Sequence, residues 1–271
     1  MDHELRPKIF VRLIVALFVA FSAGCGSAVS GGVSVAGSTS VEPFAELLAE
    51  EYAITYPGDA PINVQGGGSS AGILAAQMGV ADIGMSSREL KPEEKGLNEI
   101  LIARDAIAVI VNPRNPLEDI SSEELRNVFS GHIMNWQELG WEDRTITVVT
   151  REEGSGTRGA FDELVMGTED VTPSAIVQDS NGAVRAIVAD DPYAIGYMSL
   201  GLINEEVKAL RVDEVAATAE NVVRGEYQLV RPFLFLTRGE PEGEVKAFID
   251  FVLSPKAQEL LASEGLVKAR G

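Results

Sequence analysis

Short apolar strands alternate with helical patterns along nearly the whole of this chain, and that alternation limits its fold more than any other feature. Val33–Ala36 has the character of a short buried strand, and the apolar residues that follow from Val41 keep helical spacing. Strands and helices that alternate at this spacing predict an α/β fold with mostly parallel sheets. The predicted strands are 33–36, 62–64, 81–84, 106–111, 145–149, 194–197 and 229–236. The predicted helices, with their caps, are 41–55, 71–78, 121–129, 157–165, 179–188, 242–253 and 254–264.

Clusters of glycine and hydroxyl residues stand where several of these strands end. In parallel α/β sheets, ligands bind beyond the carboxyl ends of the strands, where the following helices begin. Four such clusters in one acidic chain therefore indicate an anion site that is assembled from several segments. The clusters are Ala36–Ser40, Gly66–Gly72, Gly84–Arg88 and Gly154–Thr157.

The cluster Gly154–Thr157 is the most informative, because Arg151 lies just ahead of it and a predicted helix follows it. Free backbone N–H groups at a helix start, hydroxyl donors and a fixed guanidinium are what a tetrahedral oxyanion needs. Plainer interpretations stay open at this point. Arg151 could be a surface arginine, Ser155 and Thr157 could be N-caps, and Gly66–Gly68 could serve only a tight turn.

Residues 1–24 have the features of an export signal. A basic start is followed by the apolar run Leu13–Phe21, which is too short to span a membrane. Small residues then lead to Cys25, the only cysteine, in an arrangement that resembles a bacterial lipoprotein signal with lipidation at that cysteine. An ordinary secretory signal is the alternative. Residues 25–32 are small and predict a tether. We therefore expect an exported protein, lipid-anchored at the outer face of the bacterial cell membrane or in the periplasm.

The chain is strongly acidic, with a formal net charge of −19 at pH 7. The leader carries three basic and two acidic residues, so the rest of the chain stays near −20. A field of this sign argues against nucleic acid and anionic lipid surfaces as partners. It also opposes an anionic ligand at long range. Short-range donors in a buried site would outweigh that field, because salt screens exposed charges within about 8–10 Å.

With these residues in view, the chain resembles the phosphate-binding lipoproteins that serve bacterial phosphate ABC transporters, the PstS-like family. The resemblance covers nearly all of the chain after the leader, and its strength lies in the order and spacing of several short motifs. They are Ala36–Ser40, Gln65–Gly72, Asp82–Leu90, Asn135-Trp136, Gly154–Arg158, Ile195–Tyr197 and Arg231-Pro232.

The resemblance implies a two-lobed type II periplasmic binding protein fold with a ligand cleft between the lobes. It places lobe one at 33–110 plus 231–271 and lobe two at 111–230, with hinge strands at 106–112 and 228–236. It further implies inorganic phosphate as the ligand, no cofactor or metal, and a monomer whose closed form docks on the permease subunits of an ABC transporter.

Carried over position by position, the resemblance also implies the residues of the site. Lobe one would supply Thr39, Ser40, Ser69 and Ser87, and lobe two would supply Arg151, Ser155, Gly156 and Thr157. The expected supporting residues are Ser38, Ser70, Ser86, Arg88 and Glu153, with Glu153 bracing the arginine. Two plainer expectations stand beside these: Arg88 pairs with Glu89 or Glu93 at the surface, and Glu93, Glu94 and Glu99 form a solvated face.

The chain departs from the family pattern at Ser87, where the best-known members carry an aspartate. That carboxylate accepts the proton that phosphate carries and sulfate lacks, so it repels sulfate. A serine hydroxyl can accept or donate and would discriminate less. We therefore expect weaker selectivity against sulfate, or another acceptor such as Asp82 or Glu152.

The main rival class is an exported hydrolase with a nucleophilic serine in Gly154–Gly156. Such a serine needs a general base, and His132 is the only histidine outside the leader. A metal-dependent phosphatase would need clusters of histidine and carboxylate that the sequence lacks, although a lysine-assisted serine enzyme stays open. We expect a binding protein, not an enzyme. Two nearer rivals stay open as well: a receptor for sulfate, molybdate or arsenate, and a surface lipoprotein for phosphate sensing or adhesion.

Overall fold

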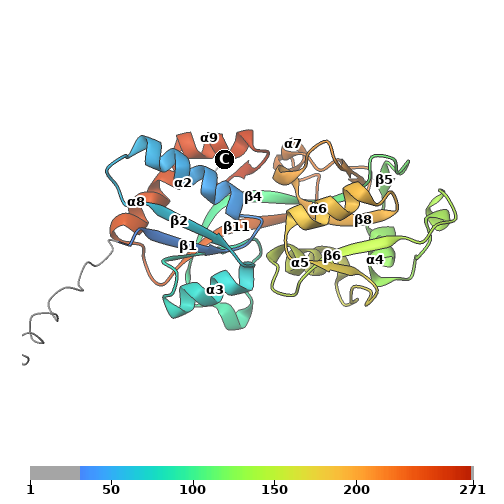
Figure 1. Ribbon diagram of the computed structural model, residues 1–271, viewed down its shortest axis with the longest axis horizontal. Helices are drawn as coiled ribbons and strands as arrows, with labels where there is room; N and C mark the ends of the chain where they lie inside the picture. The colour runs from blue at the N-terminus through green and yellow to red at the C-terminus, as the bar shows by residue number, and fades with distance from the viewer. Residues whose placement is uncertain (1–30, 270–271) are drawn as a thin grey trace, which may run out of the picture. The chain divides into compact units, whose positions relative to one another are not determined.

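The long strand β4 (Asn98–Val111) runs through the middle of the fold in the computed structural model, which describes residues 31–269 (Figure 1). Its first part pairs antiparallel with β11 (Val230–Thr237), and its second part pairs antiparallel with β8 (Ala194–Ser199). The sheet continues on both sides in the order β2–β1–β3–β11–β4–β8–β6–β7. The short strands β9 (Lys208–Ala209) and β12 (Val267–Lys268) also pair with β4, and β5 (Asp119–Ile120) pairs with β10 (Arg211–Val212).

Lobe one is the half of the sheet with parallel strands β1 (Val33–Gly37), β2 (Ile62–Gly66) and β3 (Ile83–Ser86), together with β11. Its hydrophobic core draws on residues 33–103 and 233–266, so both ends of the described chain build it. The aromatic rings of Phe235 and Phe248 stack within this core. Its helices are α2 (Glu42–Thr55), α3 (Ser69–Met78), α8 (Gly243–Val252) and α9 (Pro255–Ser263), with the 3-10 turn η1 (Pro92–Glu94).

Lobe two is built on β6 (Thr147–Arg151), β7 (Ile176–Gln178) and β8, which run parallel to one another. Its main core draws on residues 106–229, and the rings of Phe161 and Tyr197 stack there at 4.0 Å between centroids. Its helices are α4 (Ser122–Ser130), α5 (Gly156–Phe161), α6 (Asn181–Asp190) and α7 (Ala219–Val223). Shorter turns are η2 (Trp136–Leu139), the π-helical η3 (Asp162–Met166) and η4 (Leu200–Leu202).

The structure confirms the α/β class and most of the predicted elements, but the sheet is mixed where the two lobes join. The prediction of mostly parallel sheets is wrong for β4 and β11, which run antiparallel to their neighbours in the sheet. The sequence pattern predicts only the last part of β4, because Glu99, Arg104 and Asp105 interrupt its apolar run. It does not predict the edge strand β7, which is short and largely exposed.

Three glycines allow α3 to lie directly on the backbone of β1 and β3. A Cβ at Gly72 would stand 2.6 Å from the Ala36 carbonyl oxygen and 2.6 Å from Gly37 Cα. A Cβ at Gly84 would stand 2.5 Å from the Gly72 carbonyl oxygen. Real Cβ atoms do not approach backbone atoms this closely, so these positions require glycine. The close packing fixes the start of α3, which follows the Gly66–Gly68 turn.

Several predictions concern residues outside the described part of the chain. The predicted signal peptide at 1–24, the lipidation site Cys25 and most of the predicted tether at 25–32 fall there. Residues from Val33 onward form one compact unit. Among the helices that the structure describes, none is both long enough and apolar enough to cross a bilayer.

The packing of α3 generates a stability prediction. Gly72→Ala should lower the free energy of unfolding by about 1–3 kcal/mol, because the added methyl group must push the helix away from β1. Gly182→Ala in the first turn of α6 is the matched control, since nothing lies within 4 Å of its Cβ position. That variant should be as stable as the parent or gain up to about 1 kcal/mol. Chemical denaturation measures both, and equal stability of the two variants would contradict the packing argument.

Candidate functional site

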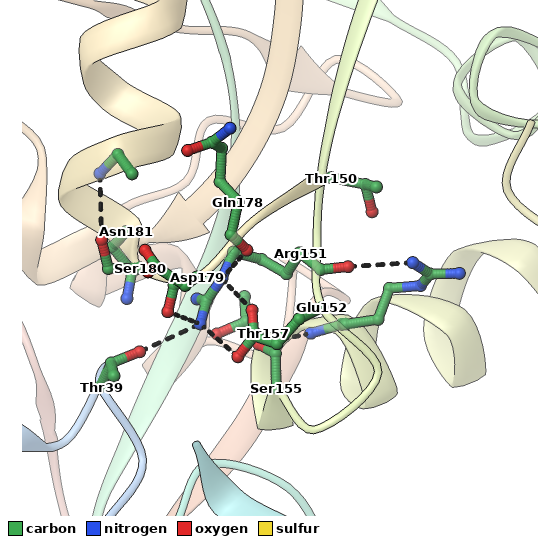
Figure 2. Close-up of polar contacts among 12 residues, drawn as sticks. Thr39, Thr150, Arg151, Glu152, Ser155, Thr157, Gln178, Asp179, Ser180 and Asn181 are labelled. Carbon is green, nitrogen blue, oxygen red and sulfur yellow. Dashed lines mark hydrogen bonds and ion pairs between the residues drawn. The ribbon is translucent and has the colours of Figure 1, made fainter. Parts of the chain in front are cut away.

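Arg151 is the last residue of β6, and its side chain is fully buried between the two lobes. Its Nε donates to Glu152 Oε2 at 2.9 Å and to the Gln178 carbonyl oxygen at 3.2 Å. Its Nη2 lies 3.0 Å from each of three acceptors, Thr39 Oγ1, Glu152 Oε1 and the Asp179 carbonyl oxygen (Figure 2). These contacts fix the plane of the guanidinium, and the Thr39 contact joins lobe two to lobe one.

The third guanidinium nitrogen, Arg151 Nη1, is buried and has no hydrogen-bond partner within residues 31–269. A buried charged donor without a partner costs about 1–3 kcal/mol or more. Arg231 Nη1 is also buried without a partner, but that guanidinium is paired with the buried Asp105 carboxylate, whereas Arg151 lies beside hydroxyl groups of both lobes and is available to an anion.

The carboxylate that braces Arg151 is Glu152, so the expectation that Glu153 does so is wrong. Glu152 Oε1 and Oε2 accept from Nη2 and Nε of the preceding residue. Glu153 is exposed in the turn that the Ser155 N–H closes by donating to the Glu152 carbonyl oxygen. The geometry of this turn determined which of two adjacent carboxylates points inward.

Tyr197 and Arg158 form hydrogen bonds with the backbone of Arg151 at the end of β6. The Tyr197 hydroxyl lies 2.7 Å from Thr150 Oγ1, and it accepts from the Arg151 backbone N–H at 3.4 Å. Burial raises the pKa of Tyr197 to about 12, so the hydroxyl stays protonated at neutral pH. Arg158 Nη1 donates to the Arg151 carbonyl oxygen at 3.0 Å. The backbone of Arg151 is therefore fixed as firmly as its side chain.

The hydroxyl groups after β1 meet lobe two directly. Ser40 Oγ lies 2.7 Å from Thr157 Oγ1, and Thr39 accepts from Arg151. Ser38 is buried behind them, and its Oγ donates to Ser87 Oγ at 2.8 Å. The Ser40 N–H donates to Ser38 Oγ at 3.2 Å. The predicted placement of Ser38 as a supporting residue fits these contacts.

Ser69 and Ser87 face the start of α5 at Gly156. A Cβ at Gly156 would stand 2.2 Å from Ser69 Oγ and 2.5 Å from Ser87 Oγ. The Ser87 N–H donates to Ser69 Oγ at 3.1 Å, and both serines are buried. The Ser155 hydroxyl accepts from the Arg158 N–H and caps α5. Ser86 is also buried, but its Oγ donates to the Arg88 carbonyl oxygen and stabilises a local turn.

Arg88 does not extend this group of hydroxyls. Its Nη1 and Nη2 pair with the Glu94 carboxylate at 2.6 and 2.7 Å, and Nη2 also donates to Ser70 Oγ at 3.2 Å. The expected surface ion pair with Glu89 or Glu93 is wrong, since Arg88 is buried and contacts Glu89 only by donating from Nη1 to its backbone carbonyl oxygen at 2.9 Å. Its hydrogen bonds lower the pKa of Glu94, which is therefore not part of a merely solvated face. Ser70 and Arg88 act as a structural pair on lobe one.

Asp82 does not supply an acceptor to the site. Its carboxylate accepts from the backbone N–H and the hydroxyl of Ser34 at 2.8 and 2.6 Å. His132, the residue on which a serine hydrolase would depend, is exposed, and its Nδ1 lies 3.0 Å from Ser130 Oγ. Within residues 31–269, no group of three or more histidine, cysteine, aspartate or glutamate side chains is placed to hold a metal ion.

The sequence reasoning missed Asn181, Ser199 and the backbone carbonyls of Gln178 and Asp179. Asn181 Nδ2 donates to Ser40 Oγ at 2.9 Å, which is a further hydrogen bond between the lobes. The sequence around Asn181 predicts a helix cap, and the N-cap is indeed Ser180. No sequence signal distinguishes an asparagine that follows a cap from one that also reaches across a cleft.

The site therefore collects hydrogen-bond donors from both lobes around one buried guanidinium. Four residues predicted to bind the ligand, Thr39, Ser40, Arg151 and Thr157, are joined across the lobes by direct hydrogen bonds. Three more, Ser69, Ser87 and Gly156, are in van der Waals proximity. This set of donors is suited to recognition of an oxyanion.

Comparison with known proteins also leads to phosphate-binding proteins, and the matches cover nearly the whole chain. A family model described as a PBP superfamily domain matches residues 25–256. The phosphate-binding protein PstS of Bacillus subtilis is 34% identical over 96% of this chain and 93% of its own length.

Solved structures agree with these sequence matches. A Clostridium perfringens protein with bound phosphate, described as a putative phosphate ABC transporter substrate-binding protein, has a TM-score of 0.86 and 43% identity. The alignment covers 89% of this chain and all of that one. An ABC-type phosphate transport receptor from Vibrio cholerae has a TM-score of 0.73 and 38% identity over 87% of this chain and 99% of that one.

These matches confirm the two-lobed periplasmic-binding-protein fold and the resemblance drawn from the sequence motifs. The chain belongs to the PBP superfamily and, within it, to the PstS family of phosphate-binding proteins.

Proposed function

We propose that this protein is an extracytoplasmic solute-binding protein that captures inorganic phosphate between its lobes and delivers it to an ABC permease. The observation that carries the proposal is Arg151 Nη1, a buried guanidinium nitrogen without a partner in the described chain, beside hydroxyl donors from both lobes. The relatives support the same ligand, because one of them is a structure with bound phosphate. They are named as binding and transport proteins, which favours a receptor over an enzyme.

The ligand set that we propose is Thr39, Ser40, Ser69, Ser87, Arg151, Ser155, Gly156 and Thr157. Ser38 supports these residues from lobe one, and Glu152 takes the bracing role from Glu153. Ser70, Ser86 and Arg88 stabilise the turns that carry the donors. A buried oxyanion needs nearly complete pairing of its oxygens, and donors on both lobes supply it only when the lobes are together.

Closure of the lobes is the proposed mechanism of capture. We place lobe one at 33–110 plus 231–271 and lobe two at 111–230, with β4 and β11 as the hinge. An open form would bind the ion on one lobe, and closure would add the other lobe's donors and expel water. The contacts between Arg151 and Thr39 and between Ser40 and Thr157 are those expected of the closed form. Anchoring by a lipid at Cys25, after removal of residues 1–24, would keep a monomer near its permease.

Selectivity follows from the direction of the hydrogen bonds around Ser87. Its Oγ already accepts from Ser38, so one of its two lone pairs is used and its own proton is available as a donor. Asp82 is engaged by Ser34, which leaves Glu152 as the carboxylate nearest to Arg151. A donor-rich site of this kind accepts any tetrahedral dianion of suitable size. We therefore propose that sulfate competes with phosphate more strongly than in relatives with an aspartate at this position.

The function itself is tested by calorimetric titration of the purified protein, after unfolding and refolding to remove carried ligand. We expect saturable 1:1 binding of phosphate, because the donors surround one ion. A large excess of sulfate should weaken that binding measurably. Complete loss in sulfate would indicate a broader oxyanion receptor. The absence of binding to either ion would contradict the transport proposal and favour sensing or adhesion.

The role of Arg151 is tested by Arg151→Ala. The variant should bind phosphate at least about tenfold more weakly, a loss of about 1.4 kcal/mol or more, because it removes a fully buried cation that donates to Thr39 on lobe one and to Asp179 on lobe two. Arg144→Ala removes an arginine whose side chain is 61% exposed and should leave affinity unchanged. Near-parental affinity of the Arg151 variant would refute the site.

Gly156 provides a test of closure. Gly156→Ala should weaken phosphate binding by about tenfold or more while the protein keeps its thermal stability, because the new methyl group meets Ser69 and Ser87 only when the lobes are together. Gly154→Ala is the matched control in the same loop, since nothing lies within 4 Å of its Cβ position. If both variants bind as the parent does, then the start of α5 does not face the ligand.

A further inference from the structure

Asn181, the first residue of α6, belongs to lobe two, yet its side chain reaches lobe one. It is 2% exposed, and its Nδ2 donates to Ser40 Oγ at 2.9 Å. Its Oδ1 accepts from the Ser199 backbone N–H at 3.1 Å. Both ends of one buried amide are therefore used, one within its own lobe and one across the cleft.

These two contacts define the orientation of the Asn181 amide. A backbone N–H can only donate, so the amide oxygen of Asn181 must face Ser199 and its nitrogen must face Ser40. Ser40 Oγ therefore accepts from Asn181, and its own proton is available to Thr157 Oγ1, 2.7 Å away, or to a bound anion. Because the amide nitrogen can only donate, Asn181 does not take up the Ser40 proton.

Hydrogen bonds connect the Asn181 amide, through Ser199, to the strands β4 and β11 that the two lobes share. Ser199 Oγ donates to Asp105 Oδ1 at 2.9 Å. Asp105 Oδ2 accepts from Arg231 Nε and Nη2 at 3.0 and 2.8 Å. Asp105 lies on β4, Arg231 lies opposite it on β11, and all of these groups are buried. A continuous chain of hydrogen bonds runs from the paired strands to Ser40.

We propose that Asn181 is a positioning residue for the anion site: it holds the closed form together and fixes the Ser40 hydroxyl as a donor. This inference rests on the proposed function, since Ser40 is a proposed ligand group. Nothing in the chemistry requires Asn181 to touch the anion. Asn181 acts on the anion through Ser40. The variants must therefore distinguish this orienting role from a purely structural one.

Two variants of Asn181 distinguish its effect on the orientation of the Ser40 hydroxyl from the effect of its side-chain packing. Asn181→Ala removes the contact across the lobes and should weaken phosphate binding by about tenfold. Asn181→Asp keeps the shape and the bond from Ser199, but it presents an acceptor to Ser40. The Ser40 proton would then turn away from the site, and a carboxylate would stand beside the anion. We expect a loss of about a hundredfold or more at pH 7.5, larger than that of the alanine variant.

The pH profile of Asn181→Asp supplies a readout that a packing defect would not give. A protonated aspartic acid can again donate to Ser40, so the ratio of variant to parental affinity should recover as the pH falls from 7.5 toward 5. The buried charged and titratable groups on the strands packed against α6 are Arg151 on β6, Asp105 on β4 with its partner Arg231, and Tyr197 on β8, whereas Glu99 and Arg104 on β4 are exposed. The parent and the Asn181→Asp variant share these groups, and phosphate titrates in the same way in both experiments. The ratio of variant to parental affinity at each pH therefore removes these contributions.

Ser180→Ala is the matched control on the same helix. Ser180 Oγ accepts from the Ala183 N–H at 3.2 Å and caps α6, but it takes no part in the chain to Ser40. Its loss should lower the thermal stability and leave phosphate affinity within about twofold of the parent. An affinity loss in Ser180→Ala equal to that of Asn181→Ala would show that both act only by weakening α6, which would overturn the proposal.

The titrations with inorganic phosphate separate this inference from the proposed function. Binding by the parent, with both Asn181 variants within about threefold of it at pH 7.5, would overturn the inference and leave the function intact. A loss in Asn181→Asp that is the same at pH 5 and 7.5 would also overturn it. A parent that does not bind phosphate would overturn the function and, with it, this role. If Asn181→Asp does not fold, the comparison of Asn181→Ala with Ser180→Ala decides.

Discussion

The pairing of β4 with β11, and the buried ion pair between Asp105 and Arg231 across it, is the interaction on which the rest of the structure depends. Both lobes share these strands, so whatever fixes them also fixes the frame on which the lobes are arranged. Burial raises the pKa of Asp105, while Arg231 and Ser199 oppose that shift by donating to the carboxylate. Removal of one partner from a buried pair costs about 3–5 kcal/mol, because the other charge is left without compensation. The pair also holds β4 and β11 at a single register, with Asp105 opposite Arg231.

The arrangement of the two lobes on β4 and β11 explains how a strongly acidic protein could bind an anion. The net charge of −19 acts at long range, where salt screens it, whereas the donors of the site act at hydrogen-bond distance inside a buried region. Within residues 31–269, Arg151 forms its one ion pair with Glu152, whose side chain is 32% exposed, and its Nη1 has no hydrogen-bond partner. The two lobes contribute complementary groups: lobe one gives mainly hydroxyls, and lobe two gives the cation and the start of α5.

Much of the site could be predicted because clusters of glycine and hydroxyl residues follow strands whose carboxyl ends meet. The clusters that contain Thr39, Ser40 and Thr157 were found in this way, the family resemblance then singled out these residues with Arg151, and the structure brings them together. The errors lie where a turn or a rotamer decides between neighbours. Glu152 and not Glu153 faces Arg151, and Arg88 turns toward Glu94. Adjacent residues of the same chemistry give the same sequence signal, so only the path of the backbone distinguishes them.

The sequence by itself determined the order of strands and helices, the family, and the segments that carry the donors, because periodicity and short motifs are local properties of a chain. Tertiary structure alone decided which donors face one another across the lobes and which are used up in local turns. It also decided that Asn181, 141 residues from Ser40 along the chain, completes the set. The physical reason is that hydrogen bonds need approach within about 3 Å and a defined direction. Both are set by the pairing of β4 with β11 and by the packing of the two cores, which no single segment encodes.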